Sequence, residues 1–212
     1  VSTKMLKEQG VPDERIIEGL ALRYNNILIK RKNTNKKKNC ILIPLSHIKD
    51  ASLELIINVK KLGEEMQNTE YNFIIKPHPN LDISKILTPK ELTGLPRNVS
   101  ISNKDLDKLL DNYLLTILMS TGAAYNAVIN GNIVFNLKSE LNFSDNYLDI
   151  FEKEFRYVNS YSLNSIQNTL LEFIKSNKKI EEYSDEFNRL SKYLITGMNI
   201  LNKKNLDKFR LK

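Results

Sequence analysis

The sequence predicts an α/β domain built on a doubly wound parallel sheet, with strands in the order 3-2-1-4-5-6 and helices at the C-terminal end. Its 212 residues suit one well-packed domain. Short apolar runs alternate with segments of helical periodicity through the middle of the chain. Because these runs are apolar at successive positions, they indicate strands buried on both faces, as in a parallel sheet covered by crossover helices.

The alternation begins at residue 40. The apolar run at 40–46 predicts a strand, and the segment after it has apolar residues at helical spacing, namely Leu55, Ile56, Val59, Leu62 and Met66. Further strands are expected at 72–77, 98–102, 114–120 and 132–137. Helices are expected between them at 83–92, 105–112 and 122–130.

Beyond residue 137 the pattern predicts one more strand, at 156–160, and two amphipathic helices. The first helix would bury Leu163, Ile166, Leu170, Phe173 and Ile174. The second would bury Phe187, Leu190, Leu194, Met198 and Leu201. Both helices are expected to dock through these apolar faces.

The chain is interpreted as four segments. Residues 1–29 are expected to be the end of a missing N-terminal domain, since the sequence begins without an initiator methionine. Residues 30–39, KRKNTNKKKN, are expected to be an exposed basic linker. Residues 40–178 would form the α/β domain, and 179–212 a C-terminal helix.

The composition leaves several kinds of partner open. Lys and Arg total 32 against 25 Asp and Glu, and this net charge of +7 suits nucleic acid, anionic lipid or phosphorylated small molecules. A solvated basic surface explains the same excess. The single cysteine, Cys40, excludes an internal disulfide framework. No apolar run reaches the roughly 20 residues that span a bilayer, and the first residues lack a secretory apolar segment, so a cytoplasmic location is expected.

Polar side chains collect where the predicted strands end. Ligands of doubly wound sheets bind beyond the carboxyl ends of the strands, at the point where the strand order reverses. In this sequence those ends carry hydroxyls, imidazoles and a glycine: Ser46, His47, His78, Ser120, Thr121 and Gly122. We therefore expect the ligand in the crevice between the first and fourth strands.

Two of these segments suggest an anionic ligand. STGAAYNAV, 120–128, joins a hydroxyl pair and a glycine to the start of a helix, whose free N–H groups attract phosphate. A simple helix cap explains the same residues. In KPHPN, 76–80, two prolines stiffen the loop and aim His78 beyond the sheet edge. This histidine is expected to donate a hydrogen bond to a phosphate, although a satisfied surface histidine is the ordinary alternative.

KPHP, followed about forty residues later by MSTGAAYNAVINGNIVFN, resembles the HP and S motifs of bacterial capsule and sialic acid polymer transferases. It also resembles the related glycerophosphate polymerases of teichoic acid synthesis. These are GT-B glycosyltransferases, and the resemblance covers their C-terminal, donor-binding half. Upstream, GVPDERIIEGLALRY, 10–24, resembles the segment that closes their N-terminal half. The resemblance implies that 40–178 is a Rossmann-like, nucleotide-donor-binding domain acting in bacterial surface carbohydrate biosynthesis.

The resemblance also implies roles for individual residues. His78 would contact the donor phosphates and help the nucleotide leave, as the catalytic residue, while Ser120 and Thr121 would bind the same phosphates from the opposing helix. The other donor-site residues would be Gly122, Lys76, Pro79, Ser46, His47, Asn136 and Glu140. For the last two, which follow the fifth strand, an ordinary polar loop is the simpler interpretation.

No metal ion and no separate cofactor are expected. Asp105 and Asp107 match a metal-binding D-x-D pattern, but they open a predicted helix, where acidic residues suit the helix dipole. The expected donor is CMP- or CDP-linked, with a UDP-linked donor as the alternative. The base that activates the acceptor is implied to lie in the N-terminal domain, so this chain would bind donor without turnover. A peripheral membrane contact stays open, and nucleic acid is not an expected partner.

Two other functions remain as alternatives. A UDP-sugar 2-epimerase shares the fold, a histidine and proline in the second-strand loop, and a phosphate-binding fourth helix. Its usual glycine pair and acidic residues are missing from STGAAYNAV. A non-catalytic module could bind a nucleotide in the crevice, or RNA or anionic lipid through 30–39. Binding of RNA there would depend steeply on salt, and the segment has no aromatic residues for stacking bases.

Overall fold

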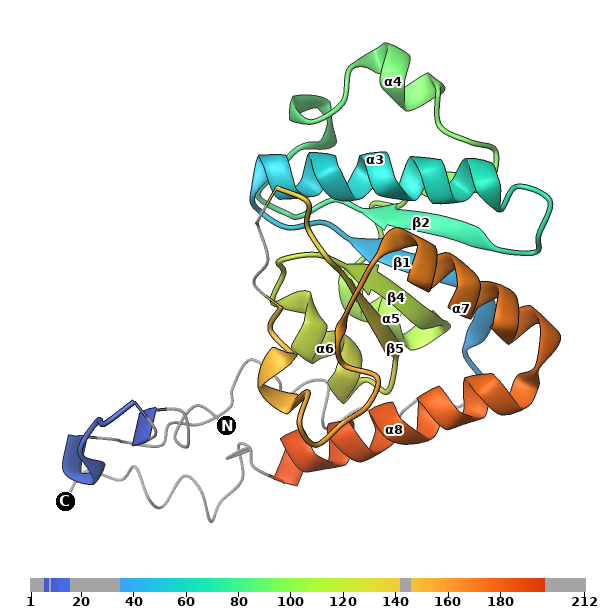
Figure 1. The fold of residues 1–212 in the computed structure, drawn as a ribbon. Helices are drawn as coiled ribbons and strands as arrows, with labels where there is room; N and C mark the ends of the chain where they lie inside the picture. The colour runs from blue at the N-terminus through green and yellow to red at the C-terminus, as the bar shows by residue number, and fades with distance from the viewer. Residues whose placement is uncertain (1–5, 8, 16–34, 142–145, 197–212) are drawn as a thin grey trace.

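The computed structural model describes residues 6–7, 9–15, 35–141 and 146–196. Its centre is a six-stranded, all-parallel sheet in the order β3-β2-β1-β4-β5-β6 (Figure 1). The strands are β1 (Lys37–Pro44), β2 (Asn72–Lys76), β3 (Val99–Ile101), β4 (Tyr113–Leu118), β5 (Ile133–Leu137) and β6 (Ser160–Tyr161). The structure therefore confirms the predicted fold class and strand order.

Helices cover both faces of the sheet (Figure 1). They are α3 (Lys49–Glu65), α4 (Pro89–Thr93), α5 (Leu106–Asn112), α6 (Ala123–Ile129), α7 (Leu163–Lys175) and α8 (Asn177–Thr196), with short 3-10 turns η1 (Asp13–Arg15), η3 (Ile83–Lys85) and η4 (Asp149–Phe151). The chain leaves β1 toward β2 through α3 and returns from β3 to β4 through α5, so right-handed crossovers place these two helices on opposite faces. α7 contacts α3, and α8 contacts α6 and α7.

The core lies on both sides of β1, β4 and β5. Ile41, Leu42 and Ile43 are fully buried at successive positions of β1, which is why this strand reads as a continuous apolar run. The predicted face of α3 is buried as expected, with Leu55, Ile56, Val59, Leu62 and Met66 in the core. Gly63 lets α3 approach β3 closely, because a Cβ at this position would lie 2.5 Å from Val99 Cγ2.

The C-terminal helices dock through the predicted faces with some changes. Ile166, Leu170 and Phe173 are buried in α7, whereas Ile174 is 42% exposed and does not belong to that face. α8 buries Phe187, Leu190 and Leu194. It begins at Asn177, whereas the C-terminal helix was expected to begin at residue 179. Met198 and Leu201 lie outside the described residues.

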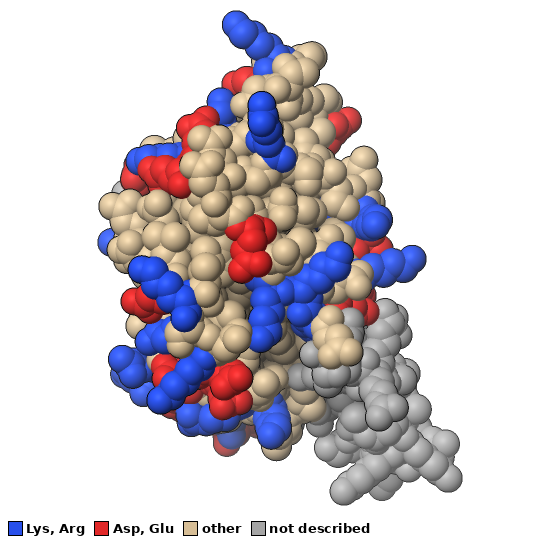
Figure 2. All heavy atoms as spheres, turned by 90° about the vertical axis from the view of Figure 1, so that its right-hand side faces the viewer, with Lys and Arg blue, Asp and Glu red and all other residues tan. Residues whose placement is uncertain are grey.

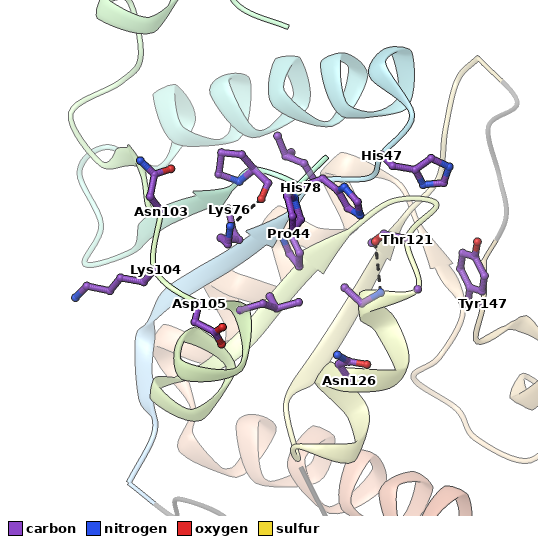
Figure 3. Close-up of a pocket in the computed structure, with 16 residues that line it drawn as sticks. Pro44, His47, Lys76, His78, Asn103, Lys104, Asp105, Thr121, Asn126 and Tyr147 are labelled. Atoms are coloured by element: carbon purple, nitrogen blue, oxygen red, sulfur yellow. Dashed lines mark hydrogen bonds between the residues drawn. The ribbon is translucent and has the colours of Figure 1, made fainter. Parts of the chain in front are cut away.

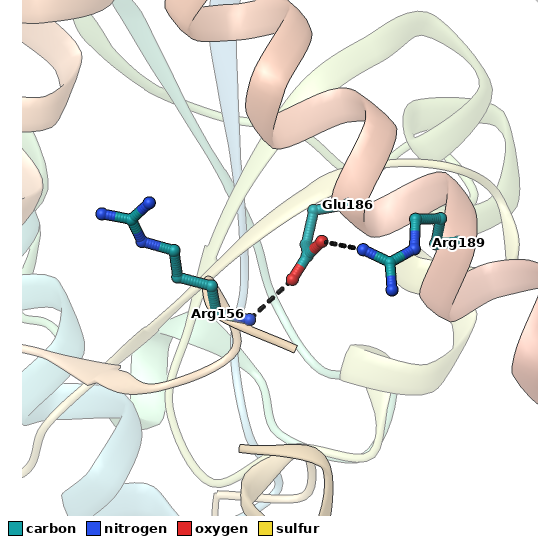
Figure 4. Close-up of polar contacts among 3 residues, drawn as sticks. All are labelled: Arg156, Glu186 and Arg189. Carbon is teal, nitrogen blue, oxygen red and sulfur yellow. Dashed lines mark hydrogen bonds and ion pairs between the residues drawn. The ribbon is translucent and has the colours of Figure 1, made fainter. Parts of the chain in front are cut away.

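Glu186 attaches α8 to the segment that precedes β6 (Figure 4). One carboxylate oxygen accepts a hydrogen bond from the backbone N–H of Arg156 at 2.6 Å, and the other pairs with Arg189 at 2.9 Å. Tyr157 stacks on Tyr183 of α8, with ring centroids 3.8 Å apart. These contacts hold the chain in place as it turns into the last strand.

Three predicted elements differ from the structure. The sixth strand was expected at 156–160 and is instead the two-residue β6, because residues before Ser160 turn around Arg156 to reach α8. The helix expected at 83–92 is split into η3 and α4, since Thr88 starts a new helix with a capping box to Glu91. β1 begins at Lys37, inside the segment expected to be a linker.

The basic segment also contributes to the domain through Lys36. Its Nζ donates hydrogen bonds to the carbonyl oxygens of Leu110 and Asn130, both at 2.8 Å, and to Asn132 Oδ1 at 3.0 Å. Leu110 lies in the last turn of α5, and Asn130 is the C-cap of α6. Lys36 therefore binds the C-terminal ends of both helices, which is a structural role for a residue that was expected to be exposed.

No helix in the described part of the chain is both long enough and apolar enough to cross a membrane.

Candidate functional site

A pocket of about 770 Å³ opens at the carboxyl ends of β1, β2 and β4, at the point where the strand order reverses (Figure 3). Four loops line it, those that follow β1, β2, β3 and β4, together with the first turns of α6 and one residue from beyond β5. The lining residues are Pro44, Leu45, His47, Lys76, Pro77, His78, Pro79, Asn103, Lys104, Asp105, Leu106, Thr121, Gly122, Ala123, Asn126 and Tyr147. The position agrees with the crevice expected from the sequence.

His78 lies in the tight loop after β2. Pro77 and Pro79 flank it, and its carbonyl accepts a hydrogen bond from the N–H of Leu81 at 3.0 Å. The ring Nδ1 accepts from the backbone N–H of Asn80 at 3.2 Å. This bond favours the neutral tautomer with its proton on Nε2, so the ring presents a single N–H donor to the pocket.

Two basic side chains neighbour His78 in the pocket (Figure 3). The ring centroids of His47 and His78 are 5.8 Å apart, and the rings are tilted by 56°. Lys76 turns back to donate to the carbonyl of Pro77 at 2.9 Å, which leaves further N–H groups on its ammonium for a ligand. Burial lowers the pKa of His78, and His47 and Lys76 lower it further. These neighbours therefore disfavour a positive charge on His78, and a bound anion would offset that effect.

The loops after β1 and β4 are tied together behind the pocket. Ser46 Oγ donates to the carbonyl of Ser120 at 2.9 Å and accepts from the N–H of Ile48 at 3.2 Å. Ser120 has a φ of +46°, the one positive value at a non-glycine position in the described ranges. A left-handed residue that is not glycine costs roughly 1–2 kcal/mol. Both serines are buried and neither lines the pocket, so their placement is structural rather than at the ligand surface.

Thr121 and Gly122 bring the start of α6 to the pocket. Thr121 Oγ1 accepts from the N–H of Ala123 at a long 3.4 Å, and Gly122 occupies the N-cap position with no side-chain cap. The alternative left open by the sequence, a helix cap at Ser120 or Thr121, is not found, because Gly122 is the N-cap and Thr121 makes only this long bond from the position before it.

Asn126 is a site residue that the sequence analysis missed. It lies on α6, is half-buried, and lines the pocket. Its Oδ1 is buried and has no hydrogen-bond partner among the residues that the structure describes. A buried acceptor without a partner costs about 1–3 kcal/mol, so this oxygen is suited to a ligand that brings a donor.

Two predicted residues lie away from the pocket. Asn136 is buried within β5, and its Nδ2 donates to Ser160 Oγ at 3.1 Å, which links β5 to β6. The N–H of Glu140 donates to the buried Glu54 of α3 at 2.6 Å, and its own side chain is exposed. Asn136 thus lies within β5 and Glu140 in the loop that follows β5, and neither residue lines this pocket.

The loop after β3 supplies another wall that was not predicted. Asn103, Lys104 and Asp105 line the pocket beside α5 (Figure 3). Asp105 Oδ1 accepts from the N–H of Asp107 at 2.9 Å and so caps α5, as the helix interpretation of the D-x-D pattern requires. No group of three or more His, Cys, Asp or Glu residues suited to a metal ion occurs in the described ranges.

A second hollow of about 380 Å³ lies at the junction of α7 and α8. It is lined by Lys175, Lys178 and Lys179 together with Glu172 and Glu182. Lys179 pairs with Glu182 at 3.6 Å, and Figure 2 shows blue and red side chains interspersed over this side of the molecule. The mixed charge makes this hollow a weaker candidate for an anion than the pocket at the sheet edge.

The strand order and the position of the pocket define a doubly wound, Rossmann-like α/β domain with a pocket at its switch point. The fold is similar to that of the glycosyltransferase SnogD from Streptomyces nogalater, with a TM-score of 0.53 and 16% identity over 87% of this chain and 45% of SnogD. The chain thus spans less than half of that protein. It also matches the wall teichoic acid polymerase TagF, with a TM-score of 0.47 and 18% identity over 99% of this chain and 57% of TagF. No protein-family model and no curated protein sequence matches the chain.

Proposed function

We propose that this domain is the nucleotide-donor-binding half of a glycosyltransferase or glycerophosphotransferase of bacterial surface carbohydrate biosynthesis. One observation carries the proposal. His47, Lys76 and His78 converge with the start of α6 in a single pocket, at the switch point of a fold shared with a glycosyltransferase. The resemblance of KPHP and STGAAYNAV to donor-binding motifs supports the same function.

The donor phosphates would lie between the loop after β2 and the loop before α6. His78 Nε2 would donate from one side, and the Thr121 hydroxyl proton would donate from the other. Lys76 adds a positive charge next to His78. Ser46 supports these loops from behind, because its Oγ donates a hydrogen bond to the carbonyl of Ser120.

Asn126 would bind a hydroxyl of the donor. Its buried Oδ1 lacks a donor in the described structure, and a ribose or sugar hydroxyl supplies one. The residue lies on the same helix whose first turn faces the phosphates, so one ligand reaches both.

In the transfer reaction, the bond between the transferred group and the donor phosphate breaks, and negative charge develops on the leaving phosphate oxygen. His78 stabilises that charge by its N–H bond, and Lys76 adds positive charge in the same pocket. We propose that these groups perform this task without a metal ion. The acceptor hydroxyl loses its proton to a base that we place in the N-terminal half of the full protein.

The first test is a titration of the purified domain with CMP, CDP, UDP and GDP in low and moderate salt, followed by calorimetry. His78→Ala is expected to weaken binding by roughly 5- to 150-fold, which corresponds to about 1–3 kcal/mol for a hydrogen bond to a charged group. A cytidine preference would favour a capsule-type or glycerophosphate transferase. A uridine preference would favour a UDP-sugar transferase or the 2-epimerase.

His78→Asn is the matched control for loop structure. An Asn side chain accepts from the backbone N–H two residues on, so it keeps the contact to Asn80 but cannot place a donor at the Nε2 position. Equal losses in His78→Ala and His78→Asn would assign the effect to the lost donor. Unchanged affinity in both folded variants would show that His78 does not bind phosphate.

A further inference from the structure

Tyr147 reaches the pocket from beyond β5, outside the strand-end loops that supply most of the lining. It is 38% exposed and lies on the opposite side of the pocket from Lys104 (Figure 3). Its ring packs edge to face with Tyr125 of α6, with the centroids 6.3 Å apart and the planes at 74°. An aromatic ring held in this way presents mostly apolar surface, which suits the organic part of a ligand better than its phosphates.

The backbone at Tyr147 forms a tight turn that Asn146 closes. The N–H of Asp149 donates to the carbonyl of Asn146 at 3.2 Å, and the N–H of Leu148 donates to Asn146 Oδ1 at 3.0 Å. Tyr147 and Leu148 are therefore the central residues of this turn, and asparagine is favoured at its first position. Leu148 is buried in the core while Tyr147 lines the pocket, so the turn sends neighbouring side chains in different directions.

The amide of Asn146 also attaches this turn to the edge of the sheet. Its Nδ2 donates to the carbonyl of Val158 at 3.3 Å and to Ser160 Oγ of β6 at 3.2 Å. Ser160 Oγ accepts a second hydrogen bond from Asn136 Nδ2 of β5 at 3.1 Å. A continuous chain of hydrogen bonds thus runs from β5 through β6 to the turn that carries Tyr147.

This chain of hydrogen bonds gives the short strand β6 a purpose. β6 has two residues and lies at the edge of the sheet, where it supplies an acceptor to Asn146. Asn146 is only 6% exposed. Because a buried amide without partners is unfavourable, Asn146 stays where these acceptors are, and the position of Tyr147 follows from it.

We propose that Asn146 is a positioning residue that holds Tyr147 against the organic part of the donor. Asn146 does not itself line the pocket, so it acts through Tyr147. The inference rests on the proposed function, because it concerns the ligand of the same site. It requires that Asn146 contribute to affinity only while the Tyr147 ring is present.

The test is a double-mutant cycle on nucleotide affinity, measured by calorimetry with the 212-residue chain and the preferred nucleotide of the CMP, CDP, UDP and GDP series. Tyr147→Ala is expected to weaken binding roughly 3- to 10-fold, the range for one aromatic contact. Asn146→Ala should weaken binding by a similar factor in the wild-type background. It should change binding by less than about twofold when Tyr147 is already replaced by alanine.

Inorganic pyrophosphate separates the two parts of the ligand, because it lacks the organic part. Its affinity should change by less than about twofold in Tyr147→Ala and in Asn146→Ala. A loss for pyrophosphate as large as the loss for the nucleotide would place Tyr147 at the phosphates and overturn the assignment.

Asn132→Ala is the matched control for loss of a buried asparagine. Asn132 is fully buried just before β5, at the opposite end of that strand, and its Nδ2 donates to the carbonyls of Leu110 and Tyr113 at 3.3 and 2.6 Å. Its replacement should lower the urea midpoint at least as much as Asn146→Ala does and leave nucleotide affinity unchanged. Ser160→Ala is a milder variant that removes one acceptor of Asn146 at an exposed residue, and it should weaken nucleotide binding less than Asn146→Ala.

The outcomes separate this inference from the proposed function. If Asn146→Ala weakens binding equally with and without the Tyr147 ring, or if Asn132→Ala weakens it as much, Asn146 acts through general stability and the inference is wrong. Unchanged affinity in Tyr147→Ala would overturn it as well. Nucleotide binding by the wild type stands in each of these cases. If no nucleotide of the series binds the wild type, the proposed function fails and this inference fails with it.

Discussion

Replacing Lys36 by methionine removes the three hydrogen bonds that join the segment before β1 to α5 and α6. The ammonium donates at 2.8 Å to the carbonyls of Leu110 and Asn130 and at 3.0 Å to Asn132 Oδ1. A hydrogen bond from a charged group contributes about 1.5–3 kcal/mol, but the three bonds share one desolvation cost at a half-buried site. We therefore expect a total loss of about 3 kcal/mol, which lowers the Tm by roughly 6–12 °C for a chain of this size.

The assay is urea unfolding followed by circular dichroism, with Lys38→Met as the matched control. Lys38 lies two residues further along and is exposed, so its replacement removes the same charge and should change the free energy of unfolding by less than about 0.5 kcal/mol. Equal midpoints for the two variants would refute the reasoning, because the destabilisation would then follow net charge rather than the helix ends.

Three further predictions concern the pocket. Ser46→Ala removes the buried bond to the Ser120 carbonyl and should lower the free energy of unfolding by about 1–2 kcal/mol in urea titrations; an unchanged value would mean that the bond contributes nothing. The pKa of His78 is lowered from its ordinary 6.5, so the unfolded chain binds this proton more readily. Stability of the ligand-free protein should therefore fall as pH drops from 6.5 through the lowered value, and thermal melts of His78→Asn should lack that part of the decline. Asn126→Ala should leave stability unchanged or raised, because Oδ1 is already unpartnered, while calorimetry shows weaker donor binding; a loss of stability with normal binding would contradict the assigned role.

The sheet could be predicted from the sequence because its strands are buried on both faces. Ile41, Leu42 and Ile43 are apolar in succession for that reason, and the turns between elements carry their own local signals. β6 could not be placed in the same way. With two residues, it owes its position to Asn136 of β5 and to the turn around Arg156, and neither contact leaves a periodic pattern.

Lys36 was missed for a related reason. The composition of its segment is typical of a solvated basic and polar loop. Composition alone does not distinguish a lysine that stays in water from one that binds the ends of two helices. The bonds that decide the matter join Lys36 to residues 74 to 96 positions away. Only the assembled sheet brings those carbonyls to the side chain.

The candidate site likewise contains residues that the sheet topology places and residues whose position depends on the local backbone conformation. His47, His78, Lys76 and Thr121 could be predicted as pocket residues because topology alone carries the ends of β1, β2 and β4 to one edge. Ser120 shows where that reasoning stops, since it is buried with a positive φ, its carbonyl accepts a hydrogen bond from Ser46, and it does not line the pocket. A polar residue at a strand end can therefore contact a ligand only if it lines the pocket. Otherwise it can still stabilise the loop that positions its neighbour.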